Sequence, residues 1–583
     1  MMIDSQDTTG QNLFAIDVNA QSRLREVDPE EFSAREHLLS SFGQWVGETV
    51  DNAARYTDLY ARPMLRSYDR DGGQIAEITH NYAWNSVNCE VYKYGVVGLN
   101  YGKQAAPFTT TFFMGYLLSQ ADVSLHCPVT MTGAVAYVLD QFAPEAIRAR
   151  YLPELIRTDG HALSGGTWVT EIHGGSDVGA TSTMARSDNE GFRLTGLKWF
   201  ASNPLGGLAL ATARPDPTTL GVRGLGLYLV PVTLPDGTPN PMRLRRLKDK
   251  LGTCGLATAE VELTDTWALE VMPPPRGLRV MMEALGFSRI HNAMAAVGLS
   301  RRAFLEAISY LSRRKAFGEQ VTQFPMVQQE LIKLLVRQEA DFELSLASAV
   351  AFDAFHSSLR ASVEDKLDHS SHPQVWLRML TALAKYQTAE NANRTCRAVI
   401  ELIGGNAYTS DYVTPRLLRD AQVTTVWEGP ANIQALELLR ILDQPYNAFQ
   451  LFDQHIEKVC AATPHALEDA SNVILLAKAE CKDAVTLMTR NNESAQHHAR
   501  TLLALMAETL AAAFLLQNAT LHLAAGDARK AIVTRLYIEE SLKRPARRGI
   551  VEGGYWGCRY FNELVGYKLI PDTVEKSWPC LAE

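Results

Sequence analysis

Short apolar runs alternate with turn signals between about Ser164 and Leu269, and long helical patterns flank this block on both sides. Within the block, the segments Asn-Glu-Gly and Pro-Asp-Gly are typical of β-hairpin turns. The predicted strands are therefore gathered in one place and do not alternate with helices. This pattern predicts an α+β chain with segregated elements and argues against an alternating β/α fold.

The flanking segments have apolar residues at positions i, i+3 and i+4, which is the period of a helix. At 583 residues the chain is long enough for three or four domains of about 150 residues. We predict an N-terminal extension (1–45), an N-terminal helical domain (46–160), a central β-barrel or β-sheet domain (161–275), a C-terminal helical bundle (276–444) and an extra helical domain (445–583).

Charge and cysteine usage narrow the class of protein. The formal net charge of -9 argues against a chain that binds nucleic acid over its whole surface. The eight cysteines are scattered without a C-x-x-C pair, so neither a zinc site nor a disulfide scaffold is expected, and a reducing cytosol fits best. The polar first ten residues lack the basic start and apolar core of a signal peptide. The most apolar stretch, Leu502 to Leu516, is interrupted by Glu508 and is predicted to be a buried helix, so no membrane is expected.

Several catalytic signatures are missing from the sequence. No G-x-G-x-x-G opens a helix after a strand, and there is no G-x-x-x-x-G-K-[ST], H-E-x-x-H or G-x-S-x-G. A Rossmann dinucleotide site, a P-loop, a zinc hydrolase and an α/β-hydrolase are therefore disfavoured.

Five short motifs follow one another along the chain. They are Thr170–Asp177 (TEIHGGSD), Lys198–Ser202 (KWFAS), Arg313–Gly318 (RRKAFG), Glu401–Tyr408 (ELIGGNAY) and Val426–Ile433 (VWEGPANI). The first contains a glycine pair whose backbone N–H groups could approach a phosphate or a flavin. The second contains a tryptophan and a serine that could stack on and bond a planar cofactor.

Each motif also has a purely structural explanation. The glycine pair in TEIHGGSD fits an ordinary β-turn, and Trp199 with Ser202 fits a core aromatic with a capping residue. Cations at a helix end and glycines at a helix C-cap need no function. Glu428 follows two apolar residues, which favours a base, but it also lies at a helix start, which favours its anion. Taken singly, the motifs leave these alternatives open.

Taken together and in this order, the five motifs resemble those of the flavin-dependent acyl-CoA dehydrogenase family, over about residues 80–443. Further features resemble the AidB-like branch of that family: the segments Ser124–Thr132 and Arg246–Gly252, a tryptophan in place of tyrosine before Glu428, and a C-terminal helical extension. The resemblance implies an N-terminal helical domain, a central β domain, a C-terminal four-helix bundle, a bound FAD and a homotetramer.

The resemblance also implies roles for individual residues. Glu428 would be the catalytic base, removing the pro-R α-proton of an acyl thioester while the β-hydrogen leaves as hydride to flavin N5. Ser176, Ser288 and Arg289 would lie beside the substrate. The implied cofactor-binding residues, some of them reaching the FAD of a neighbouring subunit, are Trp168, Thr170, Gly175, Ser176, Trp199, Ser202, Arg314, Phe317, Gln328, Glu401, Gly404, Gly405 and Asn432.

Three positions depart from the family pattern. The segment from Glu171 to Asp177 lacks the usual proline, Ala407 replaces a glycine, and Pro430 stands where a threonine or serine that bonds FAD is common. One cofactor hydrogen bond is thereby put in doubt, whereas the base is retained.

Two functions remain open from the sequence. The first is an FAD-dependent acyl-CoA dehydrogenase of fatty acid metabolism that acts on an acyl-CoA or acyl-carrier thioester and passes electrons to an electron-transfer flavoprotein. The second is an AidB-like flavoprotein that binds DNA or sequesters fatty acyl groups, using the cations Lys543, Arg544, Arg547 and Arg548 of the extension. The extension could instead be purely structural, with helices that cover the tetramer surface or occlude a substrate channel, and we favour this interpretation over the other two.

Overall fold

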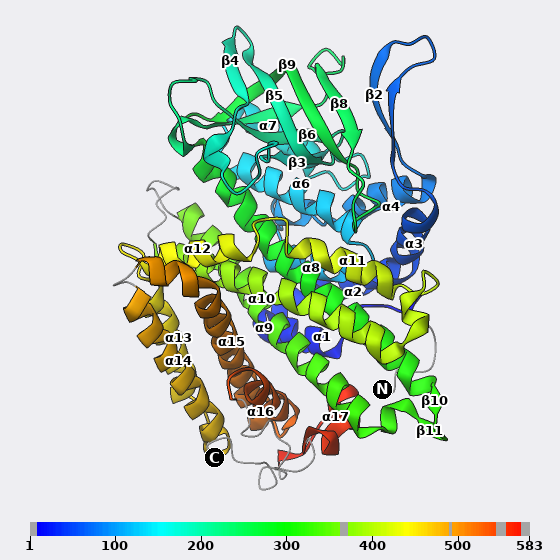
Figure 1. Cartoon of the computed structure of the whole chain (residues 1–583), viewed down its shortest axis with the longest axis vertical. Helices are drawn as coiled ribbons and strands as arrows, with labels where there is room; N and C mark the ends of the chain where they lie inside the picture. Colours follow the sequence, from blue (N-terminus) through cyan, green and yellow to red (C-terminus); the bar gives the residue numbers. More distant parts are fainter. Residues whose placement is uncertain (1–7, 362–370, 489–491, 544–555, 573–583) are drawn as a thin grey trace. The chain divides into compact units, whose positions relative to one another are not determined.

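The computed structural model describes residues 8–361, 371–488, 492–543 and 556–572. The chain divides into two compact units (Figure 1): unit 1 contains residues 1–36 and 292–583, and unit 2 contains residues 37–291. The boundaries fall inside two long helices, α2 (Pro29–Trp45) and α8 (Gly277–Arg313).

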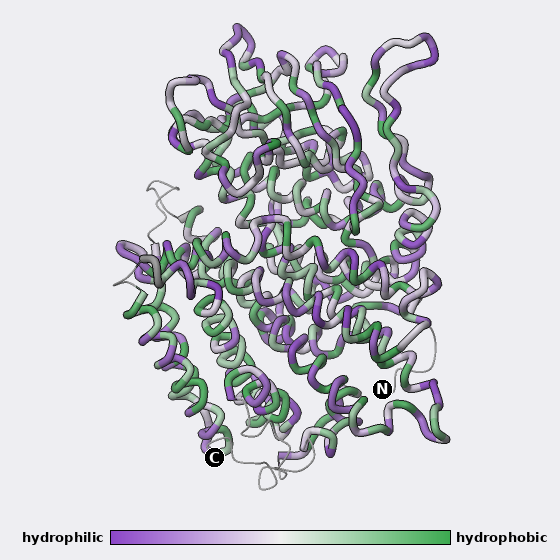
Figure 2. The backbone as a smooth tube through the Cα atoms, viewed as in Figure 1, coloured by the Kyte–Doolittle hydropathy of each residue, from purple (hydrophilic) through white to green (hydrophobic). Residues whose placement is uncertain are grey.

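The first part of unit 2 is helical and is built around two buried helices, α5 (Phe108–Ser119) and α6 (Val123–Phe142). The side chain of Asp122 caps α6 by accepting the N–H of Ser124, which fixes where that helix begins. A separate antiparallel hairpin projects from this part (Figure 1), and its tip is hydrophilic (Figure 2). The remaining elements of this part are α3 (Asp51–Tyr60), β1 (Met64–Tyr68), β2 (Gln74–Thr79), α4 (Tyr82–Lys93) and α7 (Glu145–Leu155).

The second part of unit 2 is one mixed sheet. Its order is β3-β6-β7-β9-β5-β4, with β8 also paired to β9, and only the β3–β6 pair is parallel among the described strand pairs of this sheet. Backbone bonds of 2.9 Å join Arg214, after β6, to Thr183 and Ala185 of the β4 edge, so the sheet curls back on itself. The strands are β3 (Ser164–Trp168), β4 (Met184–Asp188), β5 (Gly191–Ser202), β6 (Gly207–Ala213), β7 (Gly226–Pro231), β8 (Met242–Leu247) and β9 (Thr258–Met272).

The core of this sheet follows from the period of two in its strands. Ala209, Ala211 and Ala213 on β6 point to the same side as Tyr228 and Val230 on β7, and all five are buried in one cluster. Small residues on β6 leave room for the large ring of Tyr228. The register of the β6–β7 pair, with Ala209 opposite Val230 and Ala211 opposite Tyr228, therefore places small and large residues side by side in this core.

Unit 1 is helical. After α8 the chain forms α9 (Pro325–Ala361), α10 (His372–Ile403), α11 (Thr414–Thr424) and α12 (Ala431–Leu442), which make up the bundle. A short hairpin, β10 (Lys315–Ala316) and β11 (Glu319–Gln320), separates α8 from α9. The additional helices are α1 (Val18–Val27), α13 (Ala448–Ala461), α14 (Glu468–Met488), α15 (Asn492–Ala524), α16 (Arg529–Ser541) and α17 (Phe561–Val565).

Helix α15 is the centre of the C-terminal extension. It packs against α9, α10 and α12 of the bundle and against α14 and α16 of the extension. Its segment Ala495–Ala524 is long and apolar enough to cross a membrane by composition, but 67% of the most apolar window is buried inside the structure. The predicted buried helix over Leu502–Leu516 matches this arrangement.

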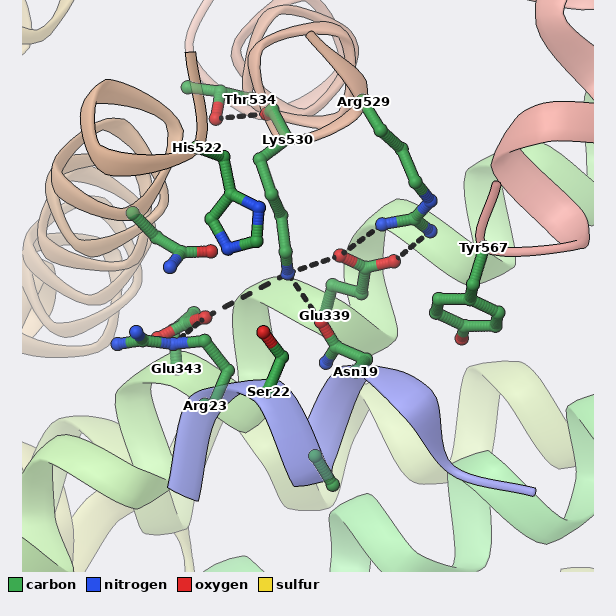
Figure 3. Close-up of polar contacts among 12 residues, drawn as sticks. Asn19, Ser22, Arg23, Glu339, Glu343, His522, Arg529, Lys530, Thr534 and Tyr567 are labelled. Carbon is green, nitrogen blue, oxygen red and sulfur yellow. Dashed lines mark hydrogen bonds and ion pairs between the residues drawn. The ribbon is translucent and has the colours of Figure 1, made fainter. Parts of the chain in front are cut away.

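A buried network of charges fastens α16 and α1 to α9 (Figure 3). Glu339 on α9 is fully buried and receives hydrogen bonds from Arg529 and Lys530 at the start of α16. Lys530 also reaches Asn19 on α1, and Glu343 lies 4.0 Å from its ammonium nitrogen. Because buried charges are tolerated only when paired, this network fixes how the terminal segments dock on the bundle.

The fold class predicted from the sequence is confirmed. Helices, then the β block of residues 164–272, then a helical bundle and extra helices follow one another along the chain as expected, whereas the β1–β2 and β10–β11 hairpins were not predicted.

Candidate active site

The first two motifs lie together in unit 2. The main-chain N–H of Trp199 donates to the carbonyl oxygen of Thr170 at 2.9 Å. The buried ammonium of Lys198 lies 2.8 Å from the carboxylate of Glu171. Ser182 and Thr183 also donate to this carboxylate. TEIHGGSD is therefore anchored to KWFAS by its buried glutamate.

Charge pairing decides the state of this anchor. Burial by itself raises the pKa of Glu171, but the charge of Lys198 and the hydrogen bonds from Lys198, Ser182 and Thr183 outweigh it and lower the pKa to about 2. Glu171 is thus held as a carboxylate at neutral pH, where it orients the loop that follows.

A one-residue bulge shapes β5 at its aromatic pair. Between Lys198 and Ala201 on β5 the partner strand β9 advances by one residue fewer. Bulges re-aim side chains, and here the rings of both Trp199 and Phe200 lie near one cation: the ammonium of Lys248 is 3.4 Å from the Trp199 ring centroid and 4.9 Å from that of Phe200.

Lys248 was not among the residues selected from the sequence. It is held by Glu260 at 2.6 Å and covers one face of the Trp199 ring. A planar cofactor therefore has only the other face of this tryptophan to meet. In the sequence Lys248 is one of several cations between Arg243 and Lys250, and nothing in that run indicated that one of them contacts a tryptophan.

The other predicted cofactor residues of unit 2 are placed as follows. Trp168 is buried, and its indole Nε1 has no hydrogen-bond partner among the described residues. Gly175 lies so close to Thr170 that an added Cβ would come 2.6 Å from its hydroxyl oxygen. Ser176 is exposed, and the Ser202 hydroxyl lies 3.0 Å from that of Thr258.

Ser288 and Arg289, the predicted substrate neighbours, lie buried on α8 within unit 2. The Ser288 hydroxyl donates to the carbonyl oxygen of Ala284 one turn earlier, at 3.0 Å. Nearby, the buried rings of His126 and His291 are joined by a 3.1 Å contact between Nε2 and Nδ1. Burial lowers the pKa of His126 to about 3, so this pair is neutral. No pattern in the sequence indicated that these two histidines meet.

The third and fourth motifs meet at one end of unit 1. The guanidinium of Arg314 donates to the carbonyl oxygen of Ile403, at the end of α10, at 3.0 Å. Asn406 donates to the hydroxyl oxygen of Tyr310 at 2.8 Å. RRKAFG and GGNAY thus form one surface although about 90 residues separate them.

This surface presents residues that no described part of unit 1 covers. Phe317 is 98% exposed and sits at the tip of the β10–β11 hairpin with φ of 53°. Gly404, with φ of 87°, ends α10, and neither it nor Gly405 has any described atom within 4 Å of an added Cβ. Open space over two glycines suits close approach of a ligand.

The remaining predicted residues of this group make local contacts or are exposed. Glu401 is exposed and paired with Arg397 at 3.0 Å. Gln328 donates to the carbonyl oxygen of Thr322 at 3.0 Å, and Asn432 is exposed in the first turn of α12.

Glu428 lies in the loop between α11 and α12. Its φ of 56° is left-handed, a conformation that costs a non-glycine residue about 1–3 kcal/mol and is enriched at functional sites. Gly429 follows with φ of 93°. Gln434, fully buried on α12, donates to the carbonyl oxygens of Glu428 and Gly429 at 3.2 and 2.9 Å.

The predicted residues are thus brought together in separate groups. Unit 2 holds the TEIHGGSD–KWFAS pair and the α8 pair, while unit 1 holds the hairpin–glycine surface and the Glu428 loop. The sequence missed Lys248 and Gln434, which act through these predicted residues.

Sequence models of known families match most of the chain. The adaptive response protein AidB N-terminal domain matches residues 4–159, the acyl-CoA dehydrogenase middle domain matches 166–266 and the acyl-CoA dehydrogenase C-terminal domain matches 275–442.

Individual proteins agree with these matches. The putative acyl-CoA dehydrogenase AidB of Escherichia coli K12 is 30% identical over 72% of this chain and 77% of its own length. Acyl-CoA dehydrogenase family member 11 of Caenorhabditis elegans is 29% identical over 81% of this chain and 77% of its own length. The crystal structure of C. elegans ACDH-11 in complex with C11-CoA superposes with a TM-score of 0.85 at 26% identity, covering 97% of this chain and 96% of that one.

Proposed function

The chain belongs to the acyl-CoA dehydrogenase family, in its AidB-like branch, and from this membership we propose that it oxidises an acyl-CoA thioester to the trans-2-enoyl thioester with Glu428 as the base. The family makes it an oxidoreductase. Its cofactor is FAD.

The proposed reaction breaks two C–H bonds and forms one C=C bond. The carboxylate of Glu428 takes the proton from the α-carbon, and the electron pair of that bond becomes the second bond between the α- and β-carbons. When bound, FAD supplies the acceptor for the β-hydrogen, which leaves as hydride to flavin N5. The two electrons removed from the substrate then pass to an external acceptor, for which we propose an electron-transfer flavoprotein.

The left-handed, glutamine-clamped conformation of Glu428 is the observation that carries this proposal. A non-glycine residue in this conformation is costly and is enriched at functional sites, and the clamp on its carbonyl oxygen holds the side chain in one direction, as a base needs. The match of the C-terminal dehydrogenase domain over residues 275–442 includes this loop.

The residues present fit a flavin dinucleotide. In unit 2, the unsatisfied indole N–H of Trp168 and the exposed Gly175–Ser176 turn offer hydrogen-bond donors to the cofactor. In unit 1, Arg314 offers a cation and the Gly404–Gly405 turn offers close backbone approach, both suited to phosphate and ribose groups. The exposed Phe317 supports the proposal that a second copy of the chain completes the site within a homotetramer.

The substrate class is proposed from the relatives. The C. elegans ACDH-11 structure described above contains C11-CoA. We therefore propose aliphatic acyl-CoA esters as the substrate class of this chain, and the experiment below determines their length. A cytosolic location is proposed from the sequence, on the cysteine pattern alone.

The test is anaerobic reduction of the purified yellow holoenzyme by a panel of acyl-CoA esters from four to sixteen carbons. Loss of the oxidised flavin absorbance with at least one ester is expected. Glu428→Gln should lower the reduction rate about 10²–10⁴-fold with unchanged FAD content. Glu457→Gln, an exposed acid on α13, is the matched control and should behave as wild type. If no ester reduces the flavin, or if Glu428→Gln is as fast as wild type, the dehydrogenase proposal is wrong.

A DNA-binding function is the alternative that the sequence leaves open, and it rests on the cations of the C-terminal extension. Of its four predicted cations, Lys543 is partly buried, and Arg544, Arg547 and Arg548 lie outside the described residues. Retention of DNA that weakens as salt rises, and that is lost when all four become alanine, would favour it.

A further inference from the structure

The loop that carries Glu428 is held at two points by buried amide side chains. On one side, Oδ1 of Asn292, on α8, accepts the indole N–H of Trp427. On the other side, Nε2 of Gln434, on α12, donates to the carbonyl oxygens of Glu428 and Gly429. Asn292 and Gln434 are 3% and 0% exposed, so neither bond competes with bulk water.

We propose that Asn292 and Gln434 are positioning residues that together fix the orientation of Glu428, an inference that rests on the function proposed above. Neither residue reaches the reacting atoms by itself. Asn292 acts through the side chain of Trp427, and Gln434 acts through the main chain of Glu428 and Gly429.

The loop needs this support because its backbone is unfavourable by itself. Glu428 and Gly429 have φ of 56° and 93° in succession. Without external bonds, Glu428 would relax toward the right-handed region and its side chain would turn away. The first turn of α12 supplies two main-chain bonds after the loop, from the N–H groups of Ile433 and Gln434 to the carbonyl oxygen of Pro430 at 2.8 and 3.2 Å, and neither bond reaches Glu428 or Gly429.

Close packing shows that Gln434 is built against this loop. A Cβ added to Gly429 would come 2.9 Å from Nε2 of Gln434 and 3.0 Å from Cγ2 of Ile433. The glycine therefore serves two needs: it adopts the positive φ, and it lets the glutamine amide reach both carbonyl oxygens.

The two amides use opposite halves of their hydrogen-bonding capacity. Asn292 uses only its oxygen, because its Nδ2 is buried without a hydrogen bond to any described residue. Gln434 uses only its nitrogen, because its Oε1 is likewise without a described partner. The partners fix these assignments, since an indole N–H can only donate and a carbonyl oxygen can only accept.

This polarity predicts opposite outcomes for two isosteric substitutions. Asn292→Asp keeps an oxygen for the Trp427 N–H, so kcat should stay within about threefold of wild type. Gln434→Glu removes both amide N–H donors and places oxygen against two carbonyl oxygens, so kcat should fall about 10–100-fold. Asn292→Leu removes the acceptor for the Trp427 N–H, so its kcat should fall as far as that of Gln434→Glu. KM for the acyl-CoA and FAD content should change little in all three.

Each rate is measured as single-turnover flavin reduction at the pH optimum of that variant, because an acid at position 292 adds negative charge beside the loop. Trp427→Phe removes the indole donor, so Asn292→Leu should cost little more in that background than Trp427→Phe alone. Asn472→Leu, an exposed asparagine on α14, is the control and should match wild type.

Hydrogen exchange provides a readout that does not depend on turnover. Amides of residues 426–433 should exchange at least about tenfold faster in Asn292→Leu and Gln434→Glu than in wild type. Exchange in α10 and in the rest of α12 should be unchanged. Trp427→Phe, which removes the indole donor by a small change, takes the place of Asn292→Leu if the leucine variant does not fold. Gln434→Asn, whose shorter side chain draws the amide away from the two carbonyl oxygens, takes the place of Gln434→Glu.

Several results would overturn the inference: Asn292→Asp as slow as Asn292→Leu, Gln434→Glu as fast as wild type, additive effects of Asn292→Leu and Trp427→Phe, or unchanged exchange at 426–433. Failure of the proposed function looks different. In that case no acyl-CoA reduces the wild-type flavin, while the exchange experiment still decides whether the two amides hold the loop.

Discussion

Glu339→Gln tests whether the buried charge network holds the extension to the bundle. In the folded protein the Glu339 carboxylate is fully buried and bonded to Arg529 and Lys530 (Figure 3). The glutamine variant leaves both cations buried with the carboxylate of Glu343, 4.0 Å from Lys530, as the nearest compensating charge. Breaking a buried pair in this way costs about 3–5 kcal/mol.

The pKa of Glu339 gives a second value for the free energy with which this network stabilises the fold. Burial raises the pKa of Glu339, but the charges of Arg529 and Lys530 outweigh it and lower the pKa from 4.5 to about 2. A lowered folded-state pKa means that the stabilisation is present above pH 4.5 and is lost as the pH falls toward 2. The shift corresponds to about 3 kcal/mol, in line with the mutational figure.

Scanning calorimetry at pH 7 measures the effect. For a unit of roughly 330 residues, 3–5 kcal/mol lowers the midpoint temperature by about 4–7 °C. Glu330→Gln is the matched control, because Glu330 lies on the same helix in an exposed pair with Lys333 and should cost under about 0.5 kcal/mol.

A coupled variant sharpens the test. Lys530→Met added to Glu339→Gln should cost less than the two single changes summed, because each removes a charge that the other leaves unpaired. A midpoint within 1 °C of wild type for Glu339→Gln would refute the reasoning, as would strict additivity.

Three further outcomes are expected. Lys198→Met leaves the buried Glu171 carboxylate without its cation, and FAD retention, read from the flavin-to-protein absorbance ratio, should weaken about tenfold or more; full retention would contradict the anchor. Phe317→Ala should change the stability of the apo chain by less than about 0.5 kcal/mol, because the ring is 98% exposed, yet lower FAD retention in the assembled protein; equal retention would argue against its predicted contact. The carboxylate of Asp527, 3.8 Å from Nδ1 of His522, and the 2.9 Å hydrogen bond between His522 and Glu26 raise the pKa of His522 to about 9. The stabilisation from the charged imidazole is therefore complete below pH 6.5 and should be lost, by about 1–3 kcal/mol, as the pH rises through 9; a His522→Gln variant with the same alkaline decline in midpoint temperature would exclude it.

The motifs were visible in the sequence because their chemistry is local. A glycine pair, an aromatic followed by a serine, and an acid at a helix start are all read from neighbours in the chain. Trp427 and Glu428 were found in this way. Gln434 was not, because a glutamine in the first turns of an amphipathic helix has no distinctive pattern until its partner carbonyls are placed.

Contacts between residues far apart in the chain could not be predicted, because no local pattern marks the two partners. Lys248 looks like one cation in a basic run, and only the register of β8, β9 and the bulged β5 brings it onto the Trp199 ring. Asn292 looks like one polar residue in a helix, and only the packing of α8 beside the Glu428 loop gives its oxygen an indole to accept.

By itself the sequence determined the α+β order of helices, β block and helices, because periods of two and of 3.6 are written in neighbouring residues. It also predicted five segments as carriers of the chemistry, and this stays a prediction. Only the tertiary structure decided which cations neutralise the buried acids, which face of Trp199 is covered and what holds Glu428 in its left-handed conformation. These depend on side chains that meet across long sequence separations, and the folding of the backbone, not the local pattern, sets those distances.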